Sequence, residues 1–187
     1  MKLIIASDIH GVTAPLRELF QHFDDELIFV SPWESEGSPY PNEQEGIAAF
    51  HAQHGLKRYQ EKIADAAANS PAIFIGFSVG ASAMWLHIAS EQCHPSSRAF
   101  LYYGSRIRDH QNCIPRCQTS VIFAEHEASF QPASIIPSLT HPHVICTILQ
   151  GTGHGFMNPS LASFDPQISQ QQLQKLKFAC KNNFGYS

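Results

Sequence analysis

Short apolar runs alternate with helical periodicity along most of the chain. The apolar runs that predict buried strands are residues 2–7, 26–30, 72–75, 99–103, 120–123 and 144–149. Continuous apolar runs are typical of strands that are covered on both faces. The alternation therefore predicts an α/β fold of about six mostly parallel strands with helices on both faces, in three layers.

Helical patterns fill most of the intervals between these runs. Leu16, Leu19, Phe20 and Phe23 share one face of a predicted helix, and Thr13 is suited to cap its start. Further helices are predicted around Ile47 and Phe50, around Leu56, Tyr59 and Ile63 (a new helix or a continuation past Gly55), over 79–90, and after Asp165 and Pro166.

A G-x-S-x-G pattern follows the third apolar run. Gly76-Phe77-Ser78-Val79-Gly80 stands between a predicted strand and a helix that opens with small residues. A chain that reverses sharply there presents the serine at the tip of the turn, and side chains two positions before and after would collide. A chance serine in a βα loop is the alternative. The strand-turn-helix context favours Ser78 as a nucleophile.

A serine nucleophile needs a histidine base and an acid that orients the base, in the chain order Ser, acid, His. His154 lies in a glycine-rich segment shortly after the last predicted strand. Such a loop can return an imidazole to Ser78. His87 lies within the helix that follows the serine, and His141 and His143 precede the last strand, at the opposite edge of the sheet. His154 is therefore the candidate base.

The acid is expected after the fifth apolar run. Glu125 and Glu127 both stand there, and either can orient His154. Glu127 is favoured because Glu125 is nearer the strand end, where its side chain can point away. Asp109 and Asp165 are the fallback candidates.

The first apolar run ends on a pattern of a different chemistry. Asp8 and His10 resemble the first signature of calcineurin-like metallophosphoesterases, in which Asp-x-His supplies two metal ligands. That family also needs Gly-Asp, Gly-Asn-His and Gly-His-x-His segments. The chain has no Gly-Asp or Gly-Asn pair, and the segment at His154 has one histidine where two are expected. Too few ligands remain for two metals, so no metal or cofactor is expected.

Taken together, the motifs resemble those of the dienelactone hydrolase family of α/β-hydrolases. The resemblance is concentrated at 8–13, 76–81, 102–104 and 154–156, and the last of these segments is the most specific. Glu127 stands where that family normally has an aspartate. The resemblance implies one α/β-hydrolase domain over residues 1–187, with no room for a cap domain.

The resemblance also implies a role for each matched position. Ser78 is expected to be the nucleophile, His154 the base and then the acid, and Glu127 the residue that orients His154. The backbone N–H groups of Val79 and Ile9 are expected to form the oxyanion hole.

The remaining candidates surround the expected substrate pocket. They are Asp8, His10, Trp33, Tyr40, Phe130 and Phe156. Asp8 is expected beside the nucleophile turn or as a cap of the first helix, and the four aromatic residues are equally well core residues. Founding members of the family use a cysteine nucleophile and arginines that hold a substrate carboxylate. This chain departs from that pattern: its nucleophile candidate is Ser78, and Asn158, not an arginine, stands four residues after His154. The departures favour a general small ester, thioester or lactone as substrate.

Composition narrows the class of protein further. The chain has 187 residues, of which 43% are hydrophobic and 15% charged, as expected for one packed domain. Its net charge of -4, without a basic stripe, argues against nucleic-acid binding. The first apolar run is too short for a signal peptide and no later run can span a membrane, so a cytoplasmic protein is expected. The five cysteines are scattered, which argues against a disulfide framework or a zinc site.

Three classes of function follow from these patterns. A serine hydrolase that acts on a small ester, thioester or lactone through Ser78, His154 and Glu127 is the leading hypothesis. A metal-dependent phosphoesterase built on Asp8 and His10 is the second. A non-catalytic protein with a hydrolase fold that binds a ligand or partner is the third. Oligomeric state is not encoded in the motifs.

Overall fold

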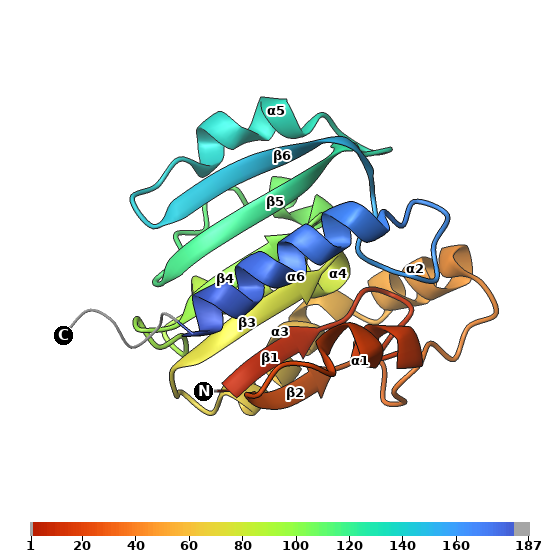
Figure 1. Ribbon diagram of the computed structural model, residues 1–187, viewed down its shortest axis with the longest axis horizontal. Coiled ribbons are helices and arrows are strands. Elements are labelled where there is room, and N and C mark those ends of the chain that lie inside the picture. The colour runs from red at the N-terminus through yellow and green to blue at the C-terminus, as the bar shows by residue number, and fades with distance from the viewer. Residues whose placement is uncertain (1, 182–187) are drawn as a thin grey trace.

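Six strands form one sheet in the computed structural model, which describes residues 2–181. They are β1 (Lys2–Ala6), β2 (Glu26–Val30), β3 (Ala72–Phe77), β4 (Arg98–Tyr102), β5 (Gln118–His126) and β6 (Val144–Gly153). The strand order is β2-β1-β3-β4-β5-β6, and every neighbouring pair is parallel (Figure 1). The carboxyl ends of all six strands therefore share one edge of the sheet, and the predicted α/β class is confirmed.

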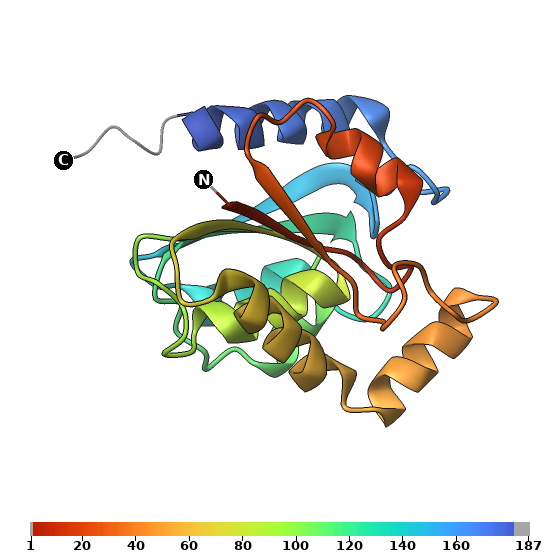
Figure 2. The ribbon, with the colours of Figure 1, turned by 90° about the horizontal axis from the view of Figure 1, so that it is seen from below.

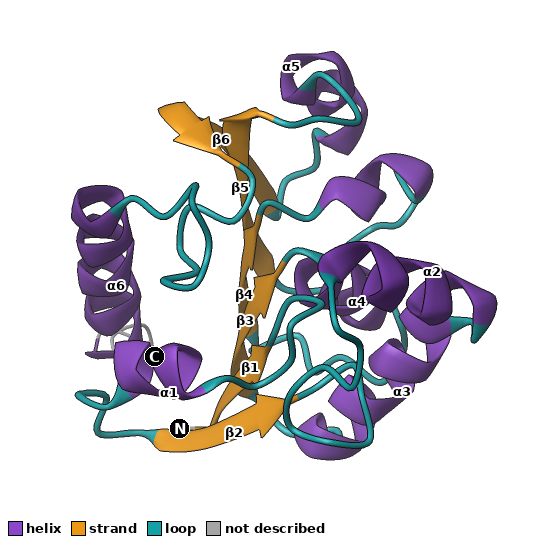
Figure 3. Ribbon diagram, turned by 90° about the vertical axis from the view of Figure 1, so that its right-hand side faces the viewer, coloured by secondary structure: helices purple, strands orange, loops and turns teal. Residues whose placement is uncertain are grey.

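Helices cover both faces of this sheet. They are α1 (Ala14–Phe20), α2 (Glu43–Ala52), α3 (Gly55–Ala67), α4 (Val79–Ile88), the 3₁₀ helix η1 (Ser105–Asp109), α5 (Pro132–Ile135), the 3₁₀ helix η2 (Ile136–Leu139) and α6 (Pro166–Lys181). Figure 3 shows α1 and α6 on one face and α2, α3, α4 and α5 on the other, which gives the three predicted layers. Between residues 2 and 181, no helix has both the length and the apolar composition to cross a membrane.

The core lies on both sides of the sheet, because successive residues of a strand point to opposite faces. In β1, Leu3 and Ile5 join the cluster under α1 and α6, whereas Ile4 and Ala6 join the cluster under α3 and α4. All four side chains are fully buried. The apolar runs of the sequence thus correspond to strands that are buried on both faces of the sheet.

The predicted starts of the first and the last helix are confirmed. Thr13 Oγ1 accepts a hydrogen bond from the Leu16 N–H (3.3 Å) and caps α1. Asp165 Oδ1 accepts one from the Ile168 N–H (2.9 Å) at the start of α6. α2 and α3 are separate helices, because His54 takes a left-handed conformation (φ 51°) between them.

The last two strands run further than their apolar runs predict. β5 continues to His126 and β6 continues to Gly153, beyond the expected ends at 123 and 149. Their pairing shifts register between Ala124 and His126, and the exposed residues before Gly151 interrupt the apolar pattern of β6. The apolar pattern therefore ends before the strands do. The extra residues carry the chain to the edge of the sheet, where Glu127 and His154 follow the two strands. The short helices α5 and η2 were also not predicted.

One buried side chain in α4 has no polar partner. His87 is fully buried, and within the described residues neither of its ring nitrogens forms a hydrogen bond. Its ring packs edge-on against Phe74 with the centroids 5.0 Å apart. Burial opposes the charged form and lowers the pKa of His87 from 6.5 to about 4.

This burial predicts acid sensitivity. As the pH falls from 6.5 towards 4, the unfolded chain binds a proton at this position before the folded protein does, so stability present above pH 6.5 is lost. The expected loss is about 3 kcal/mol. His87→Leu should remove this component from urea unfolding curves measured across that range, whereas His22→Leu, which changes an exposed histidine, should retain it. Equal acid sensitivity in wild type and His87→Leu would contradict the account.

Candidate active site

Ser78 lies at a sharp turn between β3 and α4. Its backbone has φ 53° and ψ -114°, a conformation that residues other than glycine rarely adopt. The turn holds because two glycines allow close backbone approach. A Cβ on Gly76 would lie 2.6 Å from Ala81 Cα, and one on Gly80 would lie 2.5 Å from Ser7 O at the end of β1. The close packing of α4 against the end of β1 therefore maintains the strained backbone conformation of Ser78.

The turn brings the Ser78 hydroxyl to an imidazole from the other end of the chain. Ser78 Oγ lies 2.9 Å from His154 Nε2, within hydrogen-bond distance. His154 follows β6, and its backbone is held by a bond from its N–H to His126 O (3.2 Å) and by a bond from Ser163 Oγ to its carbonyl (2.6 Å). The Tyr103 ring packs edge-on against the imidazole at 5.1 Å.

A buried carboxylate holds the other nitrogen of this imidazole. Glu127 Oε2 lies 2.7 Å from His154 Nδ1, and only 2% of the Glu127 side chain is exposed. Glu125 points elsewhere and accepts a hydrogen bond from the Gly151 N–H (2.7 Å). Asp109 pairs with Arg106, and Asp165 caps α6. Of these four acids, Glu127 is the one that contacts His154.

Two backbone N–H groups are the donors that the sequence analysis expects in an oxyanion hole: that of Val79, directly after the serine, and that of Ile9, in the loop after β1. Within the described residues, the N–H groups of Val79 and Ile9 form no hydrogen bond, unlike the Ser78 N–H, which donates to Tyr102 O (3.0 Å). Val79 opens α4, where the first N–H groups have no intrahelical acceptor. Such free donors are what an oxyanion hole requires.

Asp8 lies beside this arrangement and is almost fully buried. Oδ2 accepts a hydrogen bond from Asn158 Nδ2 (2.6 Å), and Oδ1 accepts one from the His10 N–H (2.9 Å). Burial nevertheless raises the pKa of Asp8, although these hydrogen bonds and the charges of His10 and His154 oppose the rise. The α1 cap is Thr13, so the alternative role of Asp8 as that cap is wrong.

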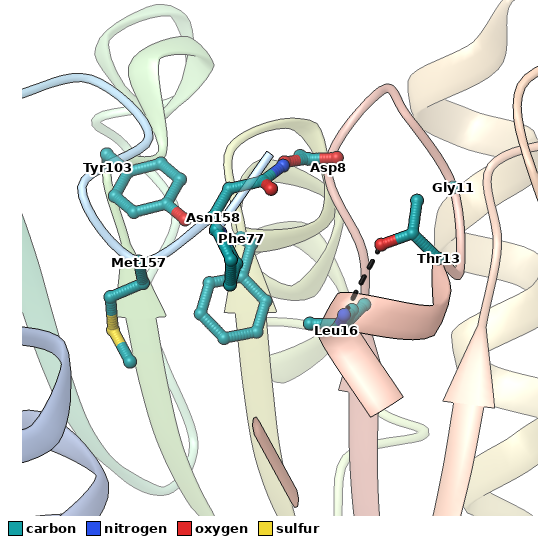
Figure 4. A pocket seen from close by; sticks show the side chains of 9 residues that line it. Asp8, Gly11, Thr13, Leu16, Phe77, Tyr103, Met157 and Asn158 are labelled. Carbon is teal, nitrogen blue, oxygen red and sulfur yellow. Dashed lines mark hydrogen bonds between the residues drawn. The ribbon is translucent and has the colours of Figure 1, made fainter. Parts of the chain in front are cut away.

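Asp8 and Asn158 belong to the wall of a small pocket. The pocket is lined by Asp8, Gly11, Thr13, Leu16, Phe77, Tyr103, Met157, Asn158 and Pro159. Figure 4 shows the Asn158 amide reaching towards Asp8, with the rings of Phe77 and Tyr103 nearby. Tyr103, which lines the pocket, also packs against His154, although Ser78 and His154 are not themselves among the lining residues.

The other predicted wall residues are placed differently. Phe156 is fully buried against Tyr102 and Tyr103, so it is a core residue. Trp33 is 7% exposed, and its indole N–H donates to Ile9 O (2.8 Å), so it supports the loop after β1 from beneath. Both rings are buried, as the core alternative expects, although Trp33 also lines a separate pocket beside β2.

The last three predicted wall residues lie outside the lining of this pocket. Half-buried Tyr40 packs on Trp33, half-buried Phe130 packs on Phe123, and His10 Nε2 lies 3.8 Å from Glu43 at the start of α2.

The described residues contain no cluster of metal ligands of the kind that the metallophosphoesterase alternative requires. Across residues 2–181, no three side chains of His, Cys, Asp or Glu come together in a group that could hold a metal ion. The oxygens of Asp8 are occupied by Asn158 and by the His10 backbone.

Sequence reasoning assigned no role to the residues that support the site. Tyr103 lies in the matched segment 102–104, and the structure shows that it has a positive φ (41°) and packs against His154. Ser163, which no motif pointed to, holds the His154 backbone. Gly155, with φ 83°, lets the histidine turn pack on Leu161. The glycine after His154 was the only signal of this tight turn that the sequence carries.

Comparison with known sequences gives one partial match. No family model matches the chain. A Bacillus subtilis protein, the uncharacterized YczH, is 35% identical over 105 residues, which are 55% of this chain and 50% of that protein. The matched part thus spans about half the length of that curated relative.

Comparison with solved structures is more informative about the fold. A proposed dienelactone hydrolase from Klebsiella pneumoniae superposes with a TM-score of 0.72 over 94% of this chain and 84% of its own, at 16% identity. A dienelactone hydrolase-like promiscuous phosphotriesterase from metagenomic libraries gives 0.67 over 98% and 87%, at 10% identity. A cold-adapted esterase from an Arctic intertidal metagenomic library gives 0.62 over 95% and 82%, at 11% identity. The chain therefore has the α/β-hydrolase fold, which it shares with these three proteins.

The close contact of α4 with β1 predicts the effect of a single methyl group. Alanine normally stabilises a helix relative to glycine, but in Gly80→Ala the added Cβ would collide with the carbonyls that end β1. We expect a loss of about 1–3 kcal/mol in urea unfolding. Gly46→Ala in α2 is the matched control, because its Cβ would meet only ordinary contacts at 3.5 Å or more, and it should be neutral or stabilising. A Gly80→Ala protein as stable as wild type would contradict the analysis.

Proposed function

We propose that this protein is a serine hydrolase that cleaves a small carboxylic ester, thioester or lactone through an acyl-enzyme. The observation that carries the proposal is the 2.9 Å contact of Ser78 Oγ with His154 Nε2 at a strained turn. A serine hydroxyl becomes a nucleophile when a base accepts its proton as it attacks. The 2.7 Å contact with Glu127 on the far side of the ring supports this assignment, because it orients the imidazole.

Acylation begins when Ser78 Oγ attacks the carbonyl carbon of the substrate. The hydroxyl proton passes to His154 Nε2, and the carbonyl oxygen becomes an oxyanion between the N–H groups of Val79 and Ile9. Glu127 stabilises the imidazolium through Nδ1. His154 then gives its proton to the leaving alcohol or thiol, the bond to that group breaks, and the acyl group stays on Ser78.

Deacylation repeats these steps with water. His154 takes a proton from a water molecule, and the resulting hydroxide equivalent attacks the acyl carbon. The second oxyanion is stabilised by the same two backbone donors. Collapse breaks the bond to Ser78, which recovers its proton from His154, and the carboxylic acid leaves.

The pocket beside the triad favours an uncharged substrate group. Its lining contains apolar or uncharged residues together with one carboxyl group, that of Asp8, and no arginine or lysine. Asn158, which stands where the resembling family has an arginine, donates to Asp8 (2.6 Å) and cannot neutralise a substrate carboxylate. This arrangement supports a small neutral ester, thioester or lactone.

Labelling with a fluorophosphonate probe tests whether Ser78 is activated. The probe should modify wild-type protein on the peptide that contains Ser78, and Ser78→Ala should abolish both labelling and hydrolysis of p-nitrophenyl acetate. Ser134→Ala, which changes a serine on the short helix α5, should keep both. Unlabelled but folded wild-type protein would favour the non-catalytic alternative, and full esterase activity in Ser78→Ala would refute the proposal.

The two glutamates allow a matched test of the triad acid. Glu127→Gln keeps the size of the side chain but removes the charge that stabilises the imidazolium, so kcat should fall by about 100-fold or more. Glu125→Gln, two residues earlier, removes a charge that lies near His126 (3.6 Å) and the Gly151 N–H (2.7 Å), and should keep kcat within about threefold. Steady-state kinetics of the two variants checks this, and the reverse order of effects would assign the acid to Glu125.

A further inference from the structure

The carboxylate of Glu127 forms few interactions that would hold it in place. Its Oε2 contacts His154, whereas its Oε1 is buried without a hydrogen-bond partner among the described residues. Most buried polar side-chain atoms have at least one hydrogen-bond partner, so the isolated Oε1 is an exception. A carboxylate with a single oriented contact keeps its place only if the backbone that carries it is fixed from outside.

Arg108 supplies contacts to that backbone segment. Its Nη1 donates to Ser129 Oγ (3.0 Å), two residues after Glu127, and its guanidinium carbon lies 5.3 Å from the centre of the Phe130 ring. Phe130 in turn packs edge-on against Phe123 of β5 at 5.8 Å. The segment after β5 is thus held between the sheet and one arginine.

Arg108 itself belongs to a rigid element. Its Nη1 also donates to Ser105 O (2.7 Å), at the start of η1. The next residue before it, Ile107, is fully buried, and the Arg106 N–H donates to Ser82 Oγ (3.2 Å) on α4. η1 is therefore fixed to the helix that carries the nucleophile turn.

Ser82 completes the connection, because its hydroxyl donates to Ser78 O (3.1 Å). A continuous set of contacts consequently runs from Ser78 through α4 and η1 to Arg108. It continues through Ser129 to the segment of Glu127, and returns to Ser78 through His154.

We infer that Arg108 is a positioning residue, which holds the segment of Glu127 against His154 by fixing Ser129 and Phe130 to η1. The inference rests on the proposed Ser-His-Glu function. The guanidinium is suited to this task, because its planar fork can donate to two acceptors while its face lies on an aromatic ring. Lysine can keep one of these contacts and should be a partial substitute.

A double-mutant cycle tests whether Arg108 acts through Glu127. Arg108→Gln should lower kcat for p-nitrophenyl acetate about tenfold and leave KM within about twofold, because misplaced catalytic groups slow chemistry without changing substrate binding. Arg108→Lys should fall between this variant and wild type. In a Glu127→Gln background, Arg108→Gln should change kcat less than twofold. If the two effects multiply instead, Arg108 acts independently of Glu127 and the inference fails.

Arg106→Gln is the matched control. Asp109 pairs with both Arg106 and Arg108, so each substitution removes one of its two arginine partners. Among the described residues, however, only Arg108 bonds to Ser129 in the segment after β5. Arg106→Gln should keep kcat within about twofold, and an equal loss in both variants would overturn the inference. If Arg108→Gln does not fold, Ser129→Ala, which removes one contact, replaces it in the same cycle with an expected loss of about threefold.

A spectroscopic measurement separates this inference from the proposed activity. The Nδ1 proton of His154, bonded to a carboxylate, should give a downfield ¹H NMR signal that Glu127→Gln removes and Arg106→Gln preserves. Arg108→Gln should move this signal upfield or broaden it. An unchanged signal refutes the positioning role, even if the enzyme is active. A changed signal in a protein whose activity does not depend on Ser78 refutes the proposed function instead.

Discussion

The close approach of α4 to the end of β1 is the constraint on which the rest of the site depends. Gly80 allows backbone atoms of the first turn of α4 to lie against Ser7 O, and Gly76 allows the same helix to cross the end of β3. Only this packing keeps Ser78 in a conformation that a serine rarely adopts. The hydroxyl consequently stands at the carboxyl edge of the sheet. Figure 2 shows the ribbon of the loops that leave β5 and β6 at this edge.

Glu127 and His154 reach that edge through an irregular pair of strands. The register shift between β5 and β6 pairs His126 with Gly153, so the residues that follow, Glu127 and His154, leave the sheet side by side. The imidazole then lies between the carboxylate and Ser78, held by Ser163 from behind. The geometry is a product of the sheet edge as a whole, because the three side chains come from three different strand ends.

The sequence predicted the parts of this structure that depend on local chemistry. Doubly buried strands, the capping of α1 by Thr13 and the glycines around Ser78 each leave a local pattern, and each was found. The extensions of β5 and β6 were not predicted, because a bulge and exposed polar residues interrupt their apolar periodicity. Phe156 and Trp33 could not be assigned in advance, since an aromatic ring beside a motif packs equally well into a core or a pocket. The supports of the site, Arg108 among them, depend on contacts between distant segments that no local pattern encodes.

Pre-steady-state kinetics with a p-nitrophenyl ester tests the central claim most directly, because an acyl adduct that forms on Ser78 during turnover requires a working nucleophile at that position. The account predicts a burst of p-nitrophenol stoichiometric with the protein, together with an acyl adduct that intact-mass analysis and peptide mapping assign to Ser78. Turnover without a burst, or with the adduct on another residue such as a cysteine, would contradict it.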